Sequence, residues 1–352
     1  MANTVESIVR RLLPINNFKG SPMVQVNSFV SLLDEILADM NKNLYDIFDA
    51  FVRNMVSGKV NVVVARMTIG KLISKLRRIS DVLAIDLCQI TLERLPKNFL
   101  FDEHIADVIQ LNASIVERHG FAKEAAVTLA TLPFEKASSY NTVLFRFDMY
   151  VKIASLFLEA DDVGQAEVYI KRAAKLESKI TVLQSTISYR MYYARILERK
   201  HKFAEAAERY IDLSSIPHIS LPVLQRAIVC TILSPVCQER SMLLAQLHQD
   251  NRIKNLLAHD IIEKMHLQIV VNRPELQIFE TLLQEHHKTI TTDGTSVYDR
   301  AIIEHNVMAC DKICDIISFE ALAAVSGTPI DVTELVASKM IAEGRLEGHI
   351  GE

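Results

Sequence analysis

Glycine and proline are scarce in this chain of 352 residues, which has only 10 Gly and 9 Pro. A fold of many short strands needs frequent turns, and these two residues concentrate in turns. Leu, Ile, Ala, Glu, Lys and Arg are abundant instead, and most of them favour helices. The chain is also longer than one compact core usually organises. We therefore expect a mainly helical protein, built either from two domains or from repeated helical units.

Cysteine is also scarce, and its five positions are too scattered for the disulfide framework of a secreted protein. These positions are Cys88, Cys230, Cys237, Cys310 and Cys314. The N-terminal segment places Glu6 where a signal peptide needs an uninterrupted apolar stretch, and no run of about 18 consecutive apolar residues occurs. We expect a soluble protein of the cytoplasm and nucleus, in a reducing compartment and without a membrane partner.

An excess of basic charge is missing as well, since the formal net charge at pH 7 is −4. This balance argues against a general nucleic-acid binder. Asp293-Gly294 is not followed by Gly-Lys-Ser/Thr, so it predicts a turn rather than a phosphate-binding loop. Cys310 and Cys314 have no second pair of ligands at a suitable spacing, and no cysteine has a local signature of a catalytic thiol. The sequence predicts no cofactor, no metal and no catalytic residue.

The clearest pattern that is present is a repeat between residues 105 and 215. Three segments each predict a helix, a short turn and a second helix entered around a small residue. The small residues Ala125, Ala166 and Ala206 lie 41 and 40 residues apart, and a larger residue follows each by four positions. A small residue lets two antiparallel helices approach closely, and the larger one fills the adjacent space. We predict degenerate tetratricopeptide-like hairpins anchored on these alanines, in a right-handed solenoid.

Residues 28–95 read as weaker versions of the same unit, so we assign residues 1–290 to one helical-repeat arm. Such an array needs a cap at each end. From about residue 291 the pattern changes. The predicted elements are a helix over Val297–Asp315, a strand over Ile316–Phe319, a helix over Phe319–Val325, a helix capped by Asp331 that ends at Gly344, and a strand over Leu346–Ile350. This order is that of a winged helix with a small β-sheet, which we assign to residues 291–352.

Regular spacing of apolar residues predicts the core of this C-terminal module. The predicted core residues are Ile303, Val307, Cys310, Cys314, Leu335, Val336 and Met340. A winged helix often binds DNA, but Thr295 to Glu352 holds four Lys or Arg against ten Asp or Glu, a formal charge of −6. That charge would repel a phosphate backbone. The sequence therefore favours a module that binds proteins.

Degenerate hairpins that run into one winged helix resemble the PCI family, named for the proteasome lid, the COP9 signalosome and initiation factor 3. The resemblance covers nearly the whole chain and is strongest to the signalosome members. Its most specific part is the stretch from Asp293 to Asn306, in which Asp293-Gly294 is followed by Asp299-Arg300-Ala301 and Glu304-His305-Asn306. Arg199 to Tyr210, Cys230 to Leu233 and Ile262 to Met265 add to it.

The resemblance implies a non-catalytic scaffold and regulatory subunit of the complex that removes the modifier NEDD8 from cullin-RING ubiquitin ligases. Its partners would be other PCI subunits, MPN subunits and cullin-RING ligases, and the catalytic JAMM metalloprotease would be another subunit. A JAMM site needs His-x-His with a Glu and an Asp, and this chain has no His-x-His. Its nearest approach, His286-His287, predicts side chains that point in different directions.

We expect the assembly surface to lie on the C-terminal module, at Asp293, Asp299, Arg300, Glu304, His305, Asn306, Leu346 and Ile350. His305 lies about 200° around the helix from Ile303 and should point away from the core, either to a partner or to solvent. Family members normally continue into a second wing strand and a terminal helix. This chain stops at Glu352, so we expect truncation within the wing or divergence. A proteasome-lid or initiation-factor subunit and a stand-alone peptide-binding adaptor remain alternatives.

Overall fold

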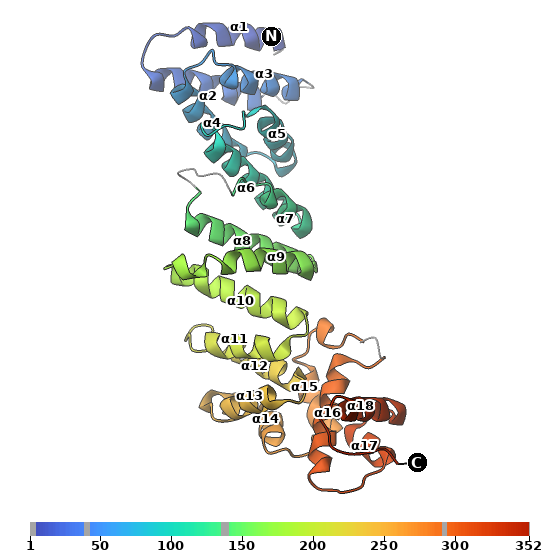
Figure 1. The fold of residues 1–352 in the computed structure, drawn as a ribbon. Coiled ribbons are helices and arrows are strands. Elements are labelled where there is room, and N and C mark those ends of the chain that lie inside the picture. Colours follow the sequence, from blue (N-terminus) through green and yellow to red (C-terminus); the bar gives the residue numbers. More distant parts are fainter. Residues whose placement is uncertain (1–4, 39–42, 135–140, 291–293, 352) are drawn as a thin grey trace. The chain divides into compact units, whose positions relative to one another are not determined.

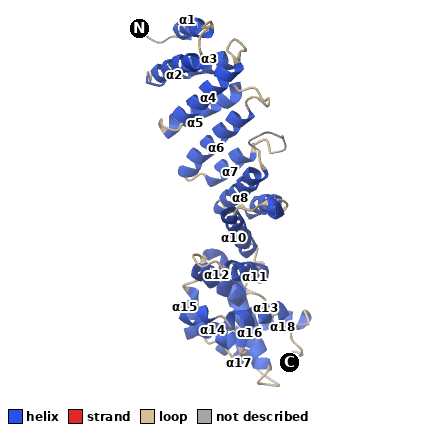
Figure 2. Cartoon of the chain, turned by 90° about the vertical axis from the view of Figure 1, so that its left-hand side faces the viewer, coloured by secondary structure: helices blue, strands red, loops and turns tan. Residues whose placement is uncertain are grey.

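The computed structural model describes residues 5–38, 43–134, 141–290 and 294–351, and it divides into two compact units, Met1–Thr181 and Val182–Glu352. Each unit consists of α-helices joined by short loops (Figure 1, Figure 2). Within the described ranges, no helix is long and apolar enough to cross a membrane. The predicted mainly helical class is confirmed. The predicted domain boundary at residue 290 is not tested by this division and stays a prediction.

The first unit contains nine α-helices within its described residues. They are α1 (Val5–Asn16), α2 (Pro22–Ala38), α3 (Leu44–Val56), α4 (Val62–Leu76), α5 (Asp81–Arg94), α6 (Asp102–Arg118), α7 (Ala122–Ala130), α8 (Val143–Glu159) and α9 (Val163–Ala174), followed by the 3₁₀ turn η1 (Glu177–Lys179). An apolar core with Phe29, Phe51 and Leu72 joins α1 to α6. In Figure 1, α8 and α9 lie side by side as one hairpin.

The second unit holds the third hairpin and the C-terminal module. Its elements are α10 (Leu183–Arg199), α11 (Phe203–Leu213), α12 (Ser220–Leu233), α13 (Gln238–His248), η2 (Asn251–Asn255), α14 (His259–His266), α15 (Arg273–Glu280), η3 (Glu285–His287), α16 (Val297–Asp311), α17 (Phe319–Ser326) and α18 (Ile330–Ala342). One core spans α10 to the first half of α16, and a smaller one joins α16, α17 and α18. The helix α16 contributes to both cores.

The three hairpin turns share one backbone geometry although their sequences differ. Gly120, Asp161 and His201 adopt left-handed backbone angles, with φ of 84°, 58° and 59°. In each turn the following residue donates its N–H to the carbonyl five positions earlier, at 3.2, 2.9 and 2.9 Å. This is the closing bond of a left-handed helix cap, after which the next helix starts at once. The repeat therefore extends to the turn itself.

The predicted anchors occupy the same position in each hairpin. Ala125, Ala166 and Ala206 are the fourth residues of α7, α9 and α11, and all three are fully buried. Leu129, Ile170 and Tyr210, one turn later, are buried beside them. A methyl side chain at this point leaves room for the preceding helix to pack closely.

The core of the C-terminal module needs two corrections. Ile303, Val307, Cys310, Val336 and Met340 are buried together. Cys314 is exposed because α16 ends at Asp311, four residues earlier than predicted, so that the helical stripe does not reach it. Leu335 is 43% exposed, since the buried face of α18 is formed by Thr333, Val336, Ala337 and Met340.

The two predicted strands and one predicted cap are also wrong. The described residues contain no strand, only an isolated bridge between Ile290 and Ser296, and the predicted β-sheet is not formed there. Ile316 is 93% exposed, and the N–H groups of Arg345 and Leu346 bond back to the Met340 carbonyl at the end of α18. An extended segment without a paired neighbour gains no ladder of hydrogen bonds. Finally, α18 begins at Ile330 after Pro329, so Asp331 is not its cap.

Candidate assembly site

The helix α16 begins with a side-chain cap that uses one of the predicted assembly residues. Ser296 Oγ accepts the N–H of Asp299 at 2.9 Å and donates to Asp299 Oδ2 at 2.6 Å. Arg273 Nη1 reaches Asp299 Oδ1 at 3.3 Å. Such a cap satisfies N–H groups that the first helical turn leaves unpaired. Asp299 thus supports the start of the helix, and Asp293, predicted beside it, lies outside the described residues.

Asn306 holds α16 against the loop before α15. Its Oδ1 accepts the Val271 N–H at 3.0 Å, and its Nδ2 donates to the Val271 carbonyl at 3.0 Å. One amide side chain therefore pairs with both backbone groups of one residue, as a neighbouring strand would. The Asn306 side chain is fully buried, so it cannot present a surface to a partner.

His305 is 4% exposed, and the prediction that it faces a partner or solvent is wrong. Its Nε2 lies 2.9 Å from the Ile269 carbonyl and donates to it, because a carbonyl can only accept. Burial, reinforced by the nearby Arg240 charge, lowers the pKa of His305 to about 4. The ring is therefore neutral at pH 7. The side opposite the apolar stripe is covered by the loop after α14 rather than by solvent.

Glu304 is buried as well, and it joins three segments. Its Oε2 accepts the Val236 N–H at 3.2 Å. Arg345 grips both carboxylate oxygens, with Nη1 to Oε2 at 2.7 Å and Nη2 to Oε1 at 3.0 Å. Arg300 Nε lies 3.9 Å from Oε1. A two-pronged arginine–carboxylate pair of this kind is among the stronger polar contacts in proteins. Glu304, Arg345, Arg300 and the Val236 N–H thus form a first buried polar cluster. It ties the C-terminal tail to the loop before α13.

Only part of the assembly surface predicted from the sequence is therefore exposed. Glu304, His305 and Asn306 lie inside the unit. Arg300 and Leu346 are partly exposed, and Ile350 is 47% exposed. Leu346 also packs on the core of α16 to α18.

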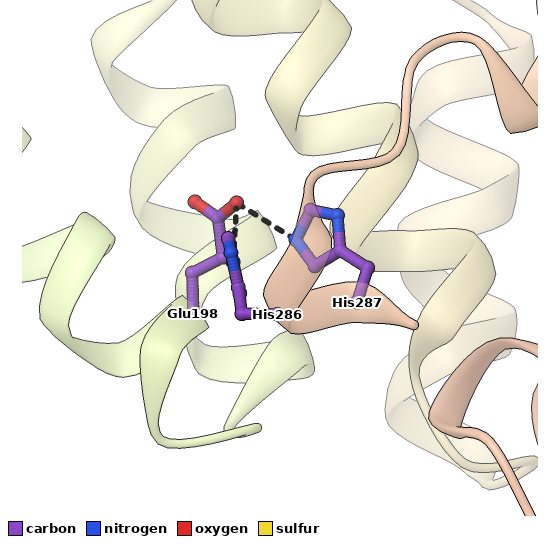
Figure 3. Close-up of side chains that lie close together, drawn as sticks. All are labelled: Glu198, His286 and His287. Atoms are coloured by element: carbon purple, nitrogen blue, oxygen red, sulfur yellow. Dashed lines mark hydrogen bonds and ion pairs between the residues drawn. The ribbon is translucent and has the colours of Figure 1, made fainter. Parts of the chain in front are cut away.

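A second buried polar cluster centres on Glu198, a residue that the sequence analysis did not single out. Glu198 lies near the end of α10, and His286 and His287 in η3 both point toward its carboxylate (Figure 3). His287 Nε2 is 3.0 Å from Glu198 Oε1, and His286 Nε2 is 3.5 Å from the same oxygen. The prediction that the two histidines point in different directions is wrong, because the 3₁₀ turn brings both rings to one carboxylate. Only the fold brings residues 89 positions apart into contact.

Further donors surround the Glu198 carboxylate. Tyr210 donates its hydroxyl to Oε2 at 2.6 Å, and Arg226 Nη2 lies 3.3 Å away. Burial by itself would raise the pKa of Glu198, but the hydrogen bonds of the two histidines, the Arg226 charge and the Tyr210 hydroxyl together hold that pKa far below its usual range. The carboxylate therefore stays ionised, and it ties η3 to α10, α11 and α12.

These ligand atoms converge closely enough to be considered for a metal ion. The neighbouring contacts argue otherwise. The Gln284 backbone N–H donates to His287 Nδ1 at 3.1 Å, so Nε2 carries the proton and donates to Glu198. A metal on Nε2 would force a proton onto Nδ1, facing that N–H, and would sit beside the Arg226 cation. The arrangement fits a structural hydrogen-bond network better than a metal centre.

A pocket lies between the two polar clusters, with a volume of about 130 Å³. Three segments line it: the turn before α11, the loop between α12 and α13, and the first half of α16. The lining residues are His201, Phe203, Leu233, Pro235, Val297, Arg300, Ala301 and Glu304. Phe203 stacks on His201 and meets His287 edge-on, with ring centres 5.5 and 6.0 Å apart. One wall of the pocket thus rests on the Glu198 cluster, and another contains Glu304.

Comparison with known proteins places the chain among named relatives. A family model described as PSMD12/CSN4, N-terminal, matches residues 23–221. A Drosophila melanogaster protein named COP9 signalosome complex subunit 4 is 36% identical over 347 residues, covering 97% of this chain and 85% of the relative. Proteins of the same name from Dictyostelium discoideum and Arabidopsis thaliana are each 30% identical, covering 86% of this chain and 78% and 79% of the relatives.

Proposed function

The chain belongs to the family of COP9 signalosome subunit 4, and we propose on that basis that it is a non-catalytic scaffold and regulatory subunit of a COP9 signalosome. The observation that carries the proposal is the similarity to the Drosophila subunit along 97% of the chain. A match of that extent spans nearly the whole chain. It is not confined to one motif.

In this proposal the complex contains other PCI subunits and MPN subunits, engages neddylated cullin-RING ligases and removes NEDD8 through a JAMM metalloprotease carried by another subunit. The arm of residues 1–290 extends toward the substrate, and the C-terminal module of residues 291–352 joins the other PCI subunits, in the nucleus and the cytoplasm. The structural contacts of the buried polar residues support a non-catalytic role. Glu198, Glu304 and His305 each form hydrogen bonds that hold segments of the chain together.

Co-purification tests this assignment. The tagged chain, expressed in its native cells, should elute in a large complex with PCI and MPN subunits of the signalosome. Recovery of proteasome-lid or initiation-factor 3 subunits instead would move the chain to another PCI complex. A solitary monomer that binds short peptides would contradict the assignment and support the adaptor alternative.

A further inference from the structure

The pocket between the two polar clusters has the size of a single side chain. Its volume of about 130 Å³ compares with the cavity of about 150 Å³ that accepts a benzene molecule in an engineered protein interior. Five of its lining residues are apolar: Phe203, Leu233, Pro235, Val297 and Ala301. A pocket of this size and lining suits one aliphatic or aromatic group better than a polar metabolite.

The walls of the pocket are held in place before any ligand arrives. Phe203 is fixed between His201 and His287, and His287 is bonded to Glu198. On the other side, Glu304 is held by the Val236 N–H and by Arg345. A site whose walls do not have to be ordered on binding loses less free energy in conformational entropy. The two buried clusters therefore act as supports for the pocket.

Charge around the pocket favours an acidic group next to the apolar one. Glu304 is the only acidic residue among the described residues that line the pocket, and Arg345 already bonds to both of its oxygens. Arg300 adds a guanidinium to the wall itself, and the buried Arg240 carries a further positive charge that interacts with Glu304. Arg300 has other contacts as well, so it contributes positive potential rather than an unused donor. This positive potential would attract an acidic group at the rim of the pocket.

We propose that this pocket receives one aliphatic or aromatic side chain of a protein partner within the assembled complex, and that an acidic residue within two positions of it in the partner chain faces Arg300. The inference rests on the proposed assembly function and identifies one of its contact points. Buried apolar anchors in pockets supply much of the binding energy of protein interfaces, while charges beside them set specificity. The partner is recognised here by an apolar residue next to an acidic one.

Photo-crosslinking in the complex tests the identity of the occupant. A benzophenone amino acid replaces Pro235 at the pocket rim, and in a control chain it replaces Met242, which is 62% exposed and outside the pocket lining. The crosslink from position 235 should map to a partner segment with a large apolar residue and an Asp or Glu within two positions. A crosslink to a segment without that pair, or none from position 235 in an assembled complex, would overturn the proposal.

Substitutions measure the charge contribution. Arg300→Glu should weaken incorporation into the complex by about tenfold or more, because it repels the acidic residue of the partner. The control Lys312→Glu reverses an exposed charge at the end of the same helix, outside the pocket lining, and should leave incorporation unchanged. Thermal melting confirms that both variants are folded. Equal incorporation of the two variants contradicts the proposal, whereas failure of the unsubstituted chain to assemble removes the proposed function and this inference with it.

Discussion

Glu304, His305 and Asn306 show how three consecutive residues can hold one helix against two separate loops of the fold. Successive helical positions are about 100° apart, so the three side chains leave α16 in three directions. Glu304 contacts Val236 in the loop before α13, whereas His305 and Asn306 contact Ile269 and Val271 in the loop between α14 and α15. The prediction for His305 required one side of α16 to face a partner or solvent, but the fold covers that side. The partners lie 68, 36 and 35 positions away, and no spacing rule connects them.

Protonation of His305 should weaken the fold in acid. Its pKa of about 4 in the folded protein lies below the ordinary value near 6.5, so the unfolded chain binds the proton more readily. The contribution of His305 is complete above about pH 6.5 and is lost as the pH falls toward 4, for a total of roughly 3 kcal/mol. Between pH 6.5 and 5 the loss should reach about 2 kcal/mol.

Urea unfolding of the second unit at several pH values, for the unsubstituted protein and for His305→Gln, measures this effect. Glutamine keeps a donor for the Ile269 carbonyl but does not titrate in this range. The variant should therefore lose less stability between pH 6.5 and 5 than the unsubstituted protein. Parallel pH profiles would show that His305 is not the titrating group.

The hairpins illustrate what is predictable at the scale of an element. The alanine anchors and the turns between paired helices follow from small residues and local periodicity, because both partners of each contact lie within one hairpin. The left-handed geometry of Asp161 and His201 was not predictable, since neither is a glycine and the strain is accepted only within the complete cap. The prediction of two C-terminal strands was wrong for a different reason. Their alternating pattern is local, but a strand also needs a partner.

Two glycines of the first unit provide a matched test of the turn geometry. Gly120 has φ of 84°, and an added Cβ would meet nothing within 4 Å, so Gly120→Ala should cost about 1 kcal/mol through backbone strain alone. Gly70 lies inside α4, where an added Cβ makes an ordinary contact at 3.8 Å. Gly70→Ala should stabilise the unit by about 0.5–1 kcal/mol. Chemical unfolding measures both, and changes of the same sign would contradict the account.

Val336 and Leu335 test the corrected core of the C-terminal helices. Val336 is 2% exposed and Leu335 is 43% exposed. Val336→Asp buries a charge without a partner, so it should lower the free energy of unfolding by several kcal/mol. It should also reduce incorporation into the complex. Leu335→Asp should change stability by less than about 1 kcal/mol. Unfolding curves and co-purification report the two effects. If Leu335→Asp were as damaging as Val336→Asp, the stripe predicted from the sequence would be correct after all.

At the scale of the whole molecule, repeats and a C-terminal helical module could be predicted from periodicity, and the family from stretches of sequence. The candidate site could not be. Glu198 gave no signal, because its role depends on His286 and His287, which reach it only through the packing of η3 against α10. The pocket likewise combines residues from three separate segments. Both features depend on long-range packing, and a single sequence does not record it.

The cleavage of a NEDD8–cullin conjugate tests the central claim most directly. The purified chain, with zinc added, should show no cleavage. The assembled complex should cleave the conjugate, and a complex prepared without this chain should cleave it much more slowly. Zinc-dependent cleavage by the chain alone, or equal cleavage by complexes with and without it, would contradict the account of a non-catalytic scaffold.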